Sequence, residues 1–105
     1  MELINDIDEL KRVLANSALN LLYIQAPDCG LCSIMLDKVG DVAMKYPHMH
    51  AIRTELLKVP QVAGSFLVAT APTVLLFHHG KEVFRAGNFI DTSQLEHIIS
   101  KFPVE

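Results

Sequence analysis

The sequence predicts an α/β fold in which helices cover both faces of a central mixed sheet. Segments of strand length alternate with segments whose apolar residues recur at helical spacing, in the order βαβαβαββα. The segment Leu19–Gln25 is an apolar run rather than an alternating one, which is typical of a central strand covered on both faces. The dipeptide His79-Gly80 separates the last two predicted strands and predicts a terminal antiparallel hairpin.

Length and composition predict a single domain that spans residues 1–105. Half of the residues are hydrophobic and 20% are charged, which excludes a disordered chain. The net charge of −3 and the lack of a basic stripe argue against a nucleic-acid partner. No apolar run approaches the ~18 residues of a membrane-spanning helix. The first residues are acidic where a signal peptide would be basic, so we expect a cytoplasmic protein without membrane association.

The N-terminal part predicts a strand, a helix and a second strand. Residues 2–4 can form a short edge strand. Asp6, with Glu9 three positions later, predicts the start of a helix that ends near Ser17. The central strand Leu19–Gln25 follows.

A second helix and a third strand are predicted next. Pro27 and Gly30 interrupt regular structure before the helix, and Pro47 ends it. Residues 48–54 predict the strand. The apolar face of the helix is expected to comprise Leu31, Met35, Val39, Val42, Ala43 and Tyr46.

The C-terminal part predicts a short helix over residues 60–66, the hairpin strands Thr73–His78 and 82–86, and a last helix capped by Thr92 or Ser93. The apolar positions of the last helix are Leu95, Ile98, Ile99 and Phe102. The phenylalanines expected to pack against the sheet are Phe77, Phe84 and Phe89.

The two cysteines of the chain, Cys29 and Cys32, stand between a predicted strand and a predicted helix. At the first turn of a helix, residues three apart lie within the ~4.4–6.8 Å Cα separation that a disulfide accepts. Cys29 would stand at the helix N-terminus, where free N–H groups and the helix dipole favour a thiolate. Cys32 would be more buried. The pair therefore predicts thiol–disulfide chemistry, with Cys29 as the nucleophile and Cys32 as the resolving thiol.

Zinc or iron–sulfur binding through the cysteine pair is an alternative, but the histidines do not complete a site. His48 and His50 are two positions apart, whereas the usual spacing is longer. His78 and His79 are adjacent and are expected to point to opposite sides. We therefore expect no metal and no cofactor.

Two motifs lie about forty residues apart in the sequence. The first motif is Ala26-x-x-Cys29-x-x-Cys32. The second motif is Phe66-x-Val68-x-x-x-Pro72-Thr73, which precedes the predicted hairpin. In their order and spacing, along nearly the whole chain, the two motifs resemble the thioredoxin family.

The resemblance implies a thioredoxin fold and a cytoplasmic protein-disulfide reductase in which Cys29 and Cys32 are catalytic. It further implies that Pro72 follows a cis peptide bond and lies against the cysteines. The backbone of Ala71 would bind an extended substrate segment, and Gly87 would lie near the same surface. The implied partners are protein disulfides and an upstream thiol reductant.

Three positions depart from the thioredoxin pattern. Asp28 replaces a tryptophan and is expected either to oppose the Cys29 thiolate or to cap the helix. Leu31 replaces a proline. Tyr23 stands where the family has a buried acid; we expect it to pack in the core, while Glu55 or a water could take the acid's place. A thioredoxin-like binding module without catalysis is therefore the second hypothesis.

Overall fold

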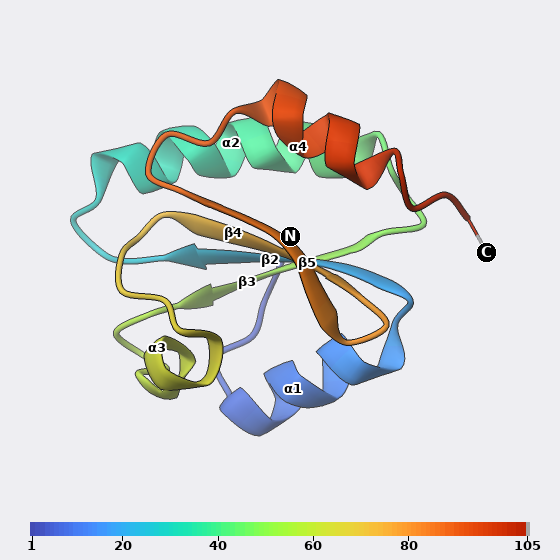
Figure 1. Ribbon diagram of the computed structural model, residues 1–105. Helices are drawn as coiled ribbons and strands as arrows, with labels where there is room; N and C mark the ends of the chain where they lie inside the picture. Colours follow the sequence, from blue (N-terminus) through green and yellow to red (C-terminus); the bar gives the residue numbers. More distant parts are fainter. Residues whose placement is uncertain (105) are drawn as a thin grey trace.

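The computed structural model describes residues 1–104 and shows a five-stranded sheet between two layers of helices (Figure 1). The elements are β1 (Glu2–Leu3), α1 (Ile7–Asn16), β2 (Leu19–Gln25), α2 (Gly30–Met44), β3 (His50–Glu55), α3 (Gln61–Phe66), β4 (Thr73–His78), β5 (Lys81–Gly87) and α4 (Thr92–Ile99). The predicted order βαβαβαββα is confirmed. Within this part of the chain no helix is long and apolar enough to cross a membrane.

The sheet has the strand order β1-β3-β2-β4-β5, which puts β2 at its centre, as predicted. Strands β1, β3 and β2 are parallel, and β4 and β5 form the antiparallel hairpin. Gln25 at the end of β2 pairs with Glu55 at the end of β3, and Ile24 pairs with Thr73 at the start of β4. The segment that leads into α2 and the loop that leads into β4 therefore meet at the same end of the central strands, where the cysteines lie.

Each face of the sheet has its own apolar core. Leu21 and Tyr23 pack with residues of α2 and α4 on one face, whereas Leu22 and Ile24 pack with residues of α1 and α3 on the other. Figure 1 shows the two helix pairs on opposite sides of the sheet. All four side chains are 0% exposed. This two-sided burial explains why β2 is apolar at successive positions rather than at alternate ones.

The helix boundaries agree with the sequence except at two places. Asp6 is the N-cap of α1, since its side chain accepts from the N–H groups of Asp8 and Glu9. The expected cap of α4 at Thr92 or Ser93 is wrong: Asp91 is the N-cap. Its carboxylate accepts from the backbone N–H groups of residues 93 and 94, at 3.0 and 3.2 Å.

Helix α2 ends earlier, and β3 begins later, than the sequence predicts. Tyr46 lies beyond the last helical residue, Met44, although its side chain still packs against the core. The Met49 N–H donates to the Tyr46 carbonyl at 2.9 Å and closes a turn after Pro47. This turn takes up residues 47–49, so the strand starts at His50.

The hairpin between β4 and β5 turns at His79 and Gly80, whose φ angles are +50° and +79°. The expectation that the rings of His78 and His79 point to opposite sides is wrong. Their ring centroids are 4.4 Å apart, because His79 has left the strand conformation. Phe77 is buried as predicted, but Phe89 is 68% exposed and does not pack against the sheet.

Candidate active site

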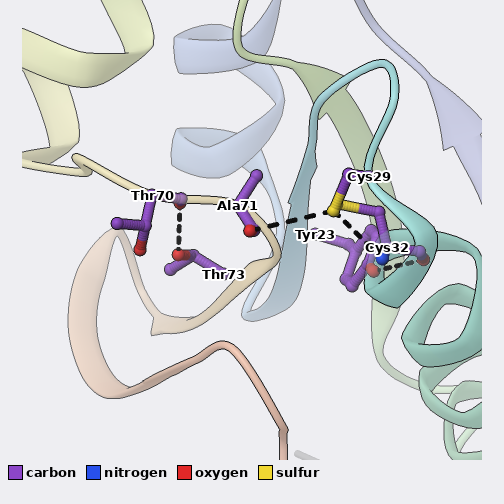
Figure 2. The surroundings of a disulfide bond; sticks show 6 residues. All are labelled: Tyr23, Cys29, Cys32, Thr70, Ala71 and Thr73. Carbon is purple, nitrogen blue, oxygen red and sulfur yellow. Dashed lines mark hydrogen bonds between the residues drawn. A yellow bond between two sulfur atoms is a disulfide. The ribbon is translucent and has the colours of Figure 1, made fainter.

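Cys29 and Cys32 form a disulfide at the first turn of α2 (Figure 2). Their Cα atoms are 5.2 Å apart, as the spacing predicts. Cys29 is the N-cap of the helix, and its Sγ accepts from the Cys32 N–H at 3.2 Å. Cys32 is 5% exposed, whereas Cys29 is only half-buried. Cys29 is therefore the more exposed of the two residues.

Asp28 does not cap α2, so that expectation is wrong. Its backbone has φ +55°, in the left-handed region, and the N-cap position belongs to Cys29. The Asp28 side chain is exposed and lines an open hollow of about 390 Å³ together with both cysteines. It thus carries its negative charge beside the disulfide without a role in the helix.

The loop before β4 brings Ala71 and Pro72 to the disulfide. The Ala71–Pro72 peptide bond is cis, as the resemblance implies. The Ala71 carbonyl oxygen lies 3.9 Å from Cys29 Sγ, although the two residues are 42 positions apart (Figure 2). The loop is held where it enters β4, because the Thr73 hydroxyl donates to the Thr70 carbonyl at 2.8 Å.

Gly87 lies against the same loop. The Asn88 N–H donates to the Pro72 carbonyl at 2.9 Å. A Cβ at Gly87 would lie 3.4 Å from Thr73 Oγ1 and 3.6 Å from the Pro72 carbonyl, so a side chain would crowd the loop. The structure thus brings together all five residues that the sequence singles out: Cys29, Cys32, Ala71, Pro72 and Gly87.

Tyr23 packs in the core as predicted, and it makes a contact that the sequence does not show. Its hydroxyl donates to the Cys32 carbonyl at 2.6 Å, and the residue is 0% exposed. Burial raises the pKa of Tyr23 to about 12, so the hydroxyl stays protonated near neutral pH. Glu55, the other candidate, places its carboxylate 3.8 Å from Lys58 Nζ. Tyr23 therefore supports the second cysteine by a hydrogen bond and not by accepting its proton.

Tyr23→Phe is expected to flatten the alkaline part of the stability profile. The folded protein keeps the Tyr23 proton to about pH 12, whereas a tyrosine in the unfolded chain ionises near 10. Stability from this group is thus complete below pH 10 and falls as pH rises from 10 towards 12. Denaturant titrations of both proteins between pH 8 and 12, at about one-unit steps, measure this slope. Equal slopes would show that Tyr23 ionises as readily in the folded state.

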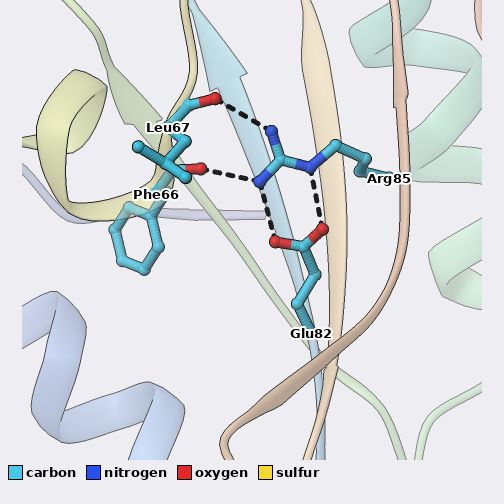
Figure 3. Close-up of polar contacts among 4 residues, drawn as sticks. All are labelled: Phe66, Leu67, Glu82 and Arg85. Carbon is cyan, nitrogen blue, oxygen red and sulfur yellow. Dashed lines mark hydrogen bonds and ion pairs between the residues drawn. The ribbon is translucent and has the colours of Figure 1, made fainter.

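Arg85 of β5 ties the end of α3 to the hairpin (Figure 3). Its Nε and Nη2 donate to the two Glu82 carboxylate oxygens at 2.8 and 2.7 Å. Its Nη1 and Nη2 also donate to the carbonyls of Leu67 and Phe66, at 2.9 and 2.7 Å. These are C-terminal carbonyls that a helix leaves without partners. The Arg85 guanidinium holds the pKa of Glu82 below its ordinary value, chiefly through the hydrogen bond.

Arg85→Met is expected to loosen the loop that runs from Leu67 to Pro72, because both carbonyls lose their donor. Hydrogen exchange of the amides in residues 67–71 should speed several-fold, while that of β2 stays unchanged. Arg85→Lys should restore little, since one ammonium cannot reproduce the planar fork of donors. Exchange at the wild-type rate in Arg85→Met would show that the loop is held by its other contacts alone.

A metal site receives no support from the geometry. Across residues 1–104, no group of three or more histidine, cysteine, aspartate or glutamate side chains is arranged to hold an ion. The cysteine pair would need ligands from outside this part of the chain.

Comparisons with known proteins identify the family. The thioredoxin family model matches residues 4–101. A thioredoxin-like protein of Bacillus subtilis, YdfQ, is 34% identical over 77 residues, which are 73% of this chain and 69% of the relative. A thioredoxin of Chlamydia trachomatis is 32% identical over 85 residues, 81% and 83% of the two chains. The chain belongs to the thioredoxin family.

Solved structures agree on the fold. Oxidised thioredoxin from Plasmodium falciparum superimposes with a TM-score of 0.86 at 18% identity, over 99% of both chains. A thioredoxin from Nicotiana alata gives 0.86 at 24% identity, over 98% of this chain and 92% of the other. The fold is the thioredoxin fold, and a cysteine pair with the Cys-x-x-Cys spacing at this place is consistent with a thiol–disulfide oxidoreductase.

Proposed function

We propose that this protein is a protein-disulfide reductase, with Cys29 as the nucleophile, Cys32 as the resolving thiol, and Ala71, Pro72 and Gly87 as the substrate-binding edge. The difference in exposure between the two cysteines carries this proposal: Cys29 is half-buried beside the Ala71 carbonyl, and Cys32 is 5% exposed. In this proposal the substrate becomes bonded to the Cys29 sulfur, and the Cys32 sulfur then releases it.

The reaction starts from the dithiol form. The Cys29 thiolate attacks one sulfur of the substrate disulfide, a bond between Cys29 and that sulfur forms, and the other substrate sulfur leaves as a thiolate that takes up a proton. Cys32, after loss of its proton, then attacks Cys29 Sγ and releases the second substrate thiol. Two electrons pass from the cysteine pair to the substrate, and the Cys29–Cys32 disulfide remains.

An upstream thiol reductant is required to regenerate the dithiol. We place this cycle in the cytoplasm, where the thiol pool keeps such pairs reduced. The backbone of Ala71 would bind an extended substrate segment through main-chain hydrogen bonds.

The proposal is tested by a redox titration of the cysteine pair against dithiothreitol, followed by turnover of a small disulfide-bonded protein with the same reductant. We expect a two-electron transition and multiple turnovers. A pair that never forms a disulfide would overturn the proposal. A reversible disulfide without turnover would favour the alternative, a binding module, in which Tyr23 instead of an acid lies against Cys32.

Asp28→Asn is expected to lower the pKa of Cys29 and to speed its alkylation by iodoacetamide at pH 7. Two unit charges about 5 Å apart in water repel by about 0.8 kcal/mol, which is about half a pKa unit. Asparagine keeps the size of the side chain and tolerates the left-handed conformation of position 28. The pH dependence of alkylation in both reduced proteins measures the shift. A higher pKa in the variant would contradict the electrostatic account.

A further inference from the structure

We propose that the hollow on the Asp28 side of the disulfide selects substrates that carry a lysine or arginine side chain next to their reacting disulfide. This inference rests on the proposed function and names its substrate class.

The hollow is acidic at the point where a substrate has to approach. Its volume is about 390 Å³, and its lining includes Asp28, both cysteines and Ser33. Asp28 is the one charged residue in this lining. Its carboxylate forms no ion pair and no side-chain hydrogen bond with any other residue between 1 and 104. A substrate therefore meets an uncompensated negative charge beside Cys29.

Gln25 adds a second acceptor to the same wall. The residue lines the hollow, and its amide oxygen is buried without a hydrogen-bond donor among the described residues. A buried acceptor without a partner costs free energy. Ammonium and guanidinium groups carry only donors, and both Gln25 Oε1 and the Asp28 carboxylate are acceptors.

A neighbouring hollow along α2 is lined by charges of both signs. It measures about 550 Å³ and shares Leu36 with the first hollow. Asp37 and Asp41 line it and, like Asp28, have no ion-pair partner in the described part of the chain. Arg53 lines the same hollow with its positive charge, and its Nε donates to the Met1 carbonyl at 3.1 Å. The charge that favours a basic segment beside the disulfide is therefore that of Asp28 in the first hollow.

The cation would act on the first chemical step. The negative charge of Asp28 opposes the thiolate of Cys29, and a substrate cation beside Asp28 offsets that repulsion. The Cys29–substrate bond then forms, and the substrate disulfide breaks, at a higher rate. Charge selection should therefore appear in the rate of mixed-disulfide formation.

The test uses one peptide with an internal disulfide, made with lysine, glutamine or glutamate beside its first cysteine. Each peptide is reduced by the fully reduced protein in a single turnover, and each rate is divided by the rate with dithiothreitol. This division removes the effect of the neighbouring charge on the peptide's own thiols. We expect the order lysine, glutamine, glutamate, with a lysine-to-glutamate ratio of about three to ten at low salt. The ratio should approach one at 1 M salt, where the screening length is about 3 Å.

Two variants locate the effect. Asp28→Asn should bring the ratio close to one, even though it speeds all three peptides. Asp8→Asn, which removes an exposed carboxylate from α1 on the other face of the sheet, changes the net charge equally and should keep the wild-type ratio. Equal rates for the three peptides, or a ratio that Asp28→Asn leaves unchanged, overturn this inference alone. If the protein reduces none of the three peptides, the proposed function is overturned and this inference with it.

Discussion

Cys29→Ser is expected to abolish protein-disulfide reduction, whereas Cys32→Ser is expected to accumulate mixed disulfides with substrates. Cys29 is half-buried and can reach a substrate disulfide, whereas Cys32 is only 5% exposed and cannot. Without Cys29 no covalent intermediate forms. Without Cys32 the intermediate forms but is not resolved, so turnover stops after one covalent event.

Mass spectrometry of the two variants after pull-down, under conditions that block free thiols, measures this difference. Trapping should be confined to Cys32→Ser. Ser93→Ala, an exposed change in the first turn of α4 and outside the hollow beside the disulfide, is the control and should turn over like the wild type. Equal trapping by both cysteine variants would overturn the assignment of roles.

Met35→Ala is expected to lower the free energy of unfolding by about 2–5 kcal/mol, the usual cost of emptying a large buried side chain. Met35 is 0% exposed and packs between α2 and the sheet. The Ile90 N–H also donates to Met35 Sδ at 3.1 Å, which ties α2 to the segment that follows Asn88. Truncation therefore opens a cavity and leaves a buried N–H without its acceptor.

Met35→Leu separates these two effects. It keeps most of the apolar volume but removes the sulfur acceptor, and we expect it to cost less than about 1.5 kcal/mol. Urea unfolding of the oxidised proteins, with the disulfide intact in each, compares the three chains. If alanine and leucine at position 35 cost the same, packing is not what this side chain contributes.

Some features of the protein follow from the sequence alone because they depend on neighbours in the chain. The apolar run of β2, the turn at His79-Gly80 and the three-residue spacing of the cysteines each express a local geometry. For this reason the element order, the central strand and the place of the cysteines at the start of α2 are confirmed. Local signals fail where neighbouring residues have the same preference. Aspartate, threonine and serine all cap helices, and only the folded backbone shows that Asp91 is the residue that caps α4.

Other features depend on which distant segments pack together, and no spacing along the chain encodes them. The Ala71 carbonyl reaches Cys29, and Gly87 reaches Pro72, because β4 pairs with both β2 and β5. The resemblance to thioredoxins implied this edge, but the residues by themselves did not. The bond from Tyr23 to Cys32 and the ties of Arg85 likewise have no sequence signal. A tyrosine in an apolar strand and an arginine in an edge strand satisfy many environments, and only the packed fold supplies the particular carbonyls to which their donors bind.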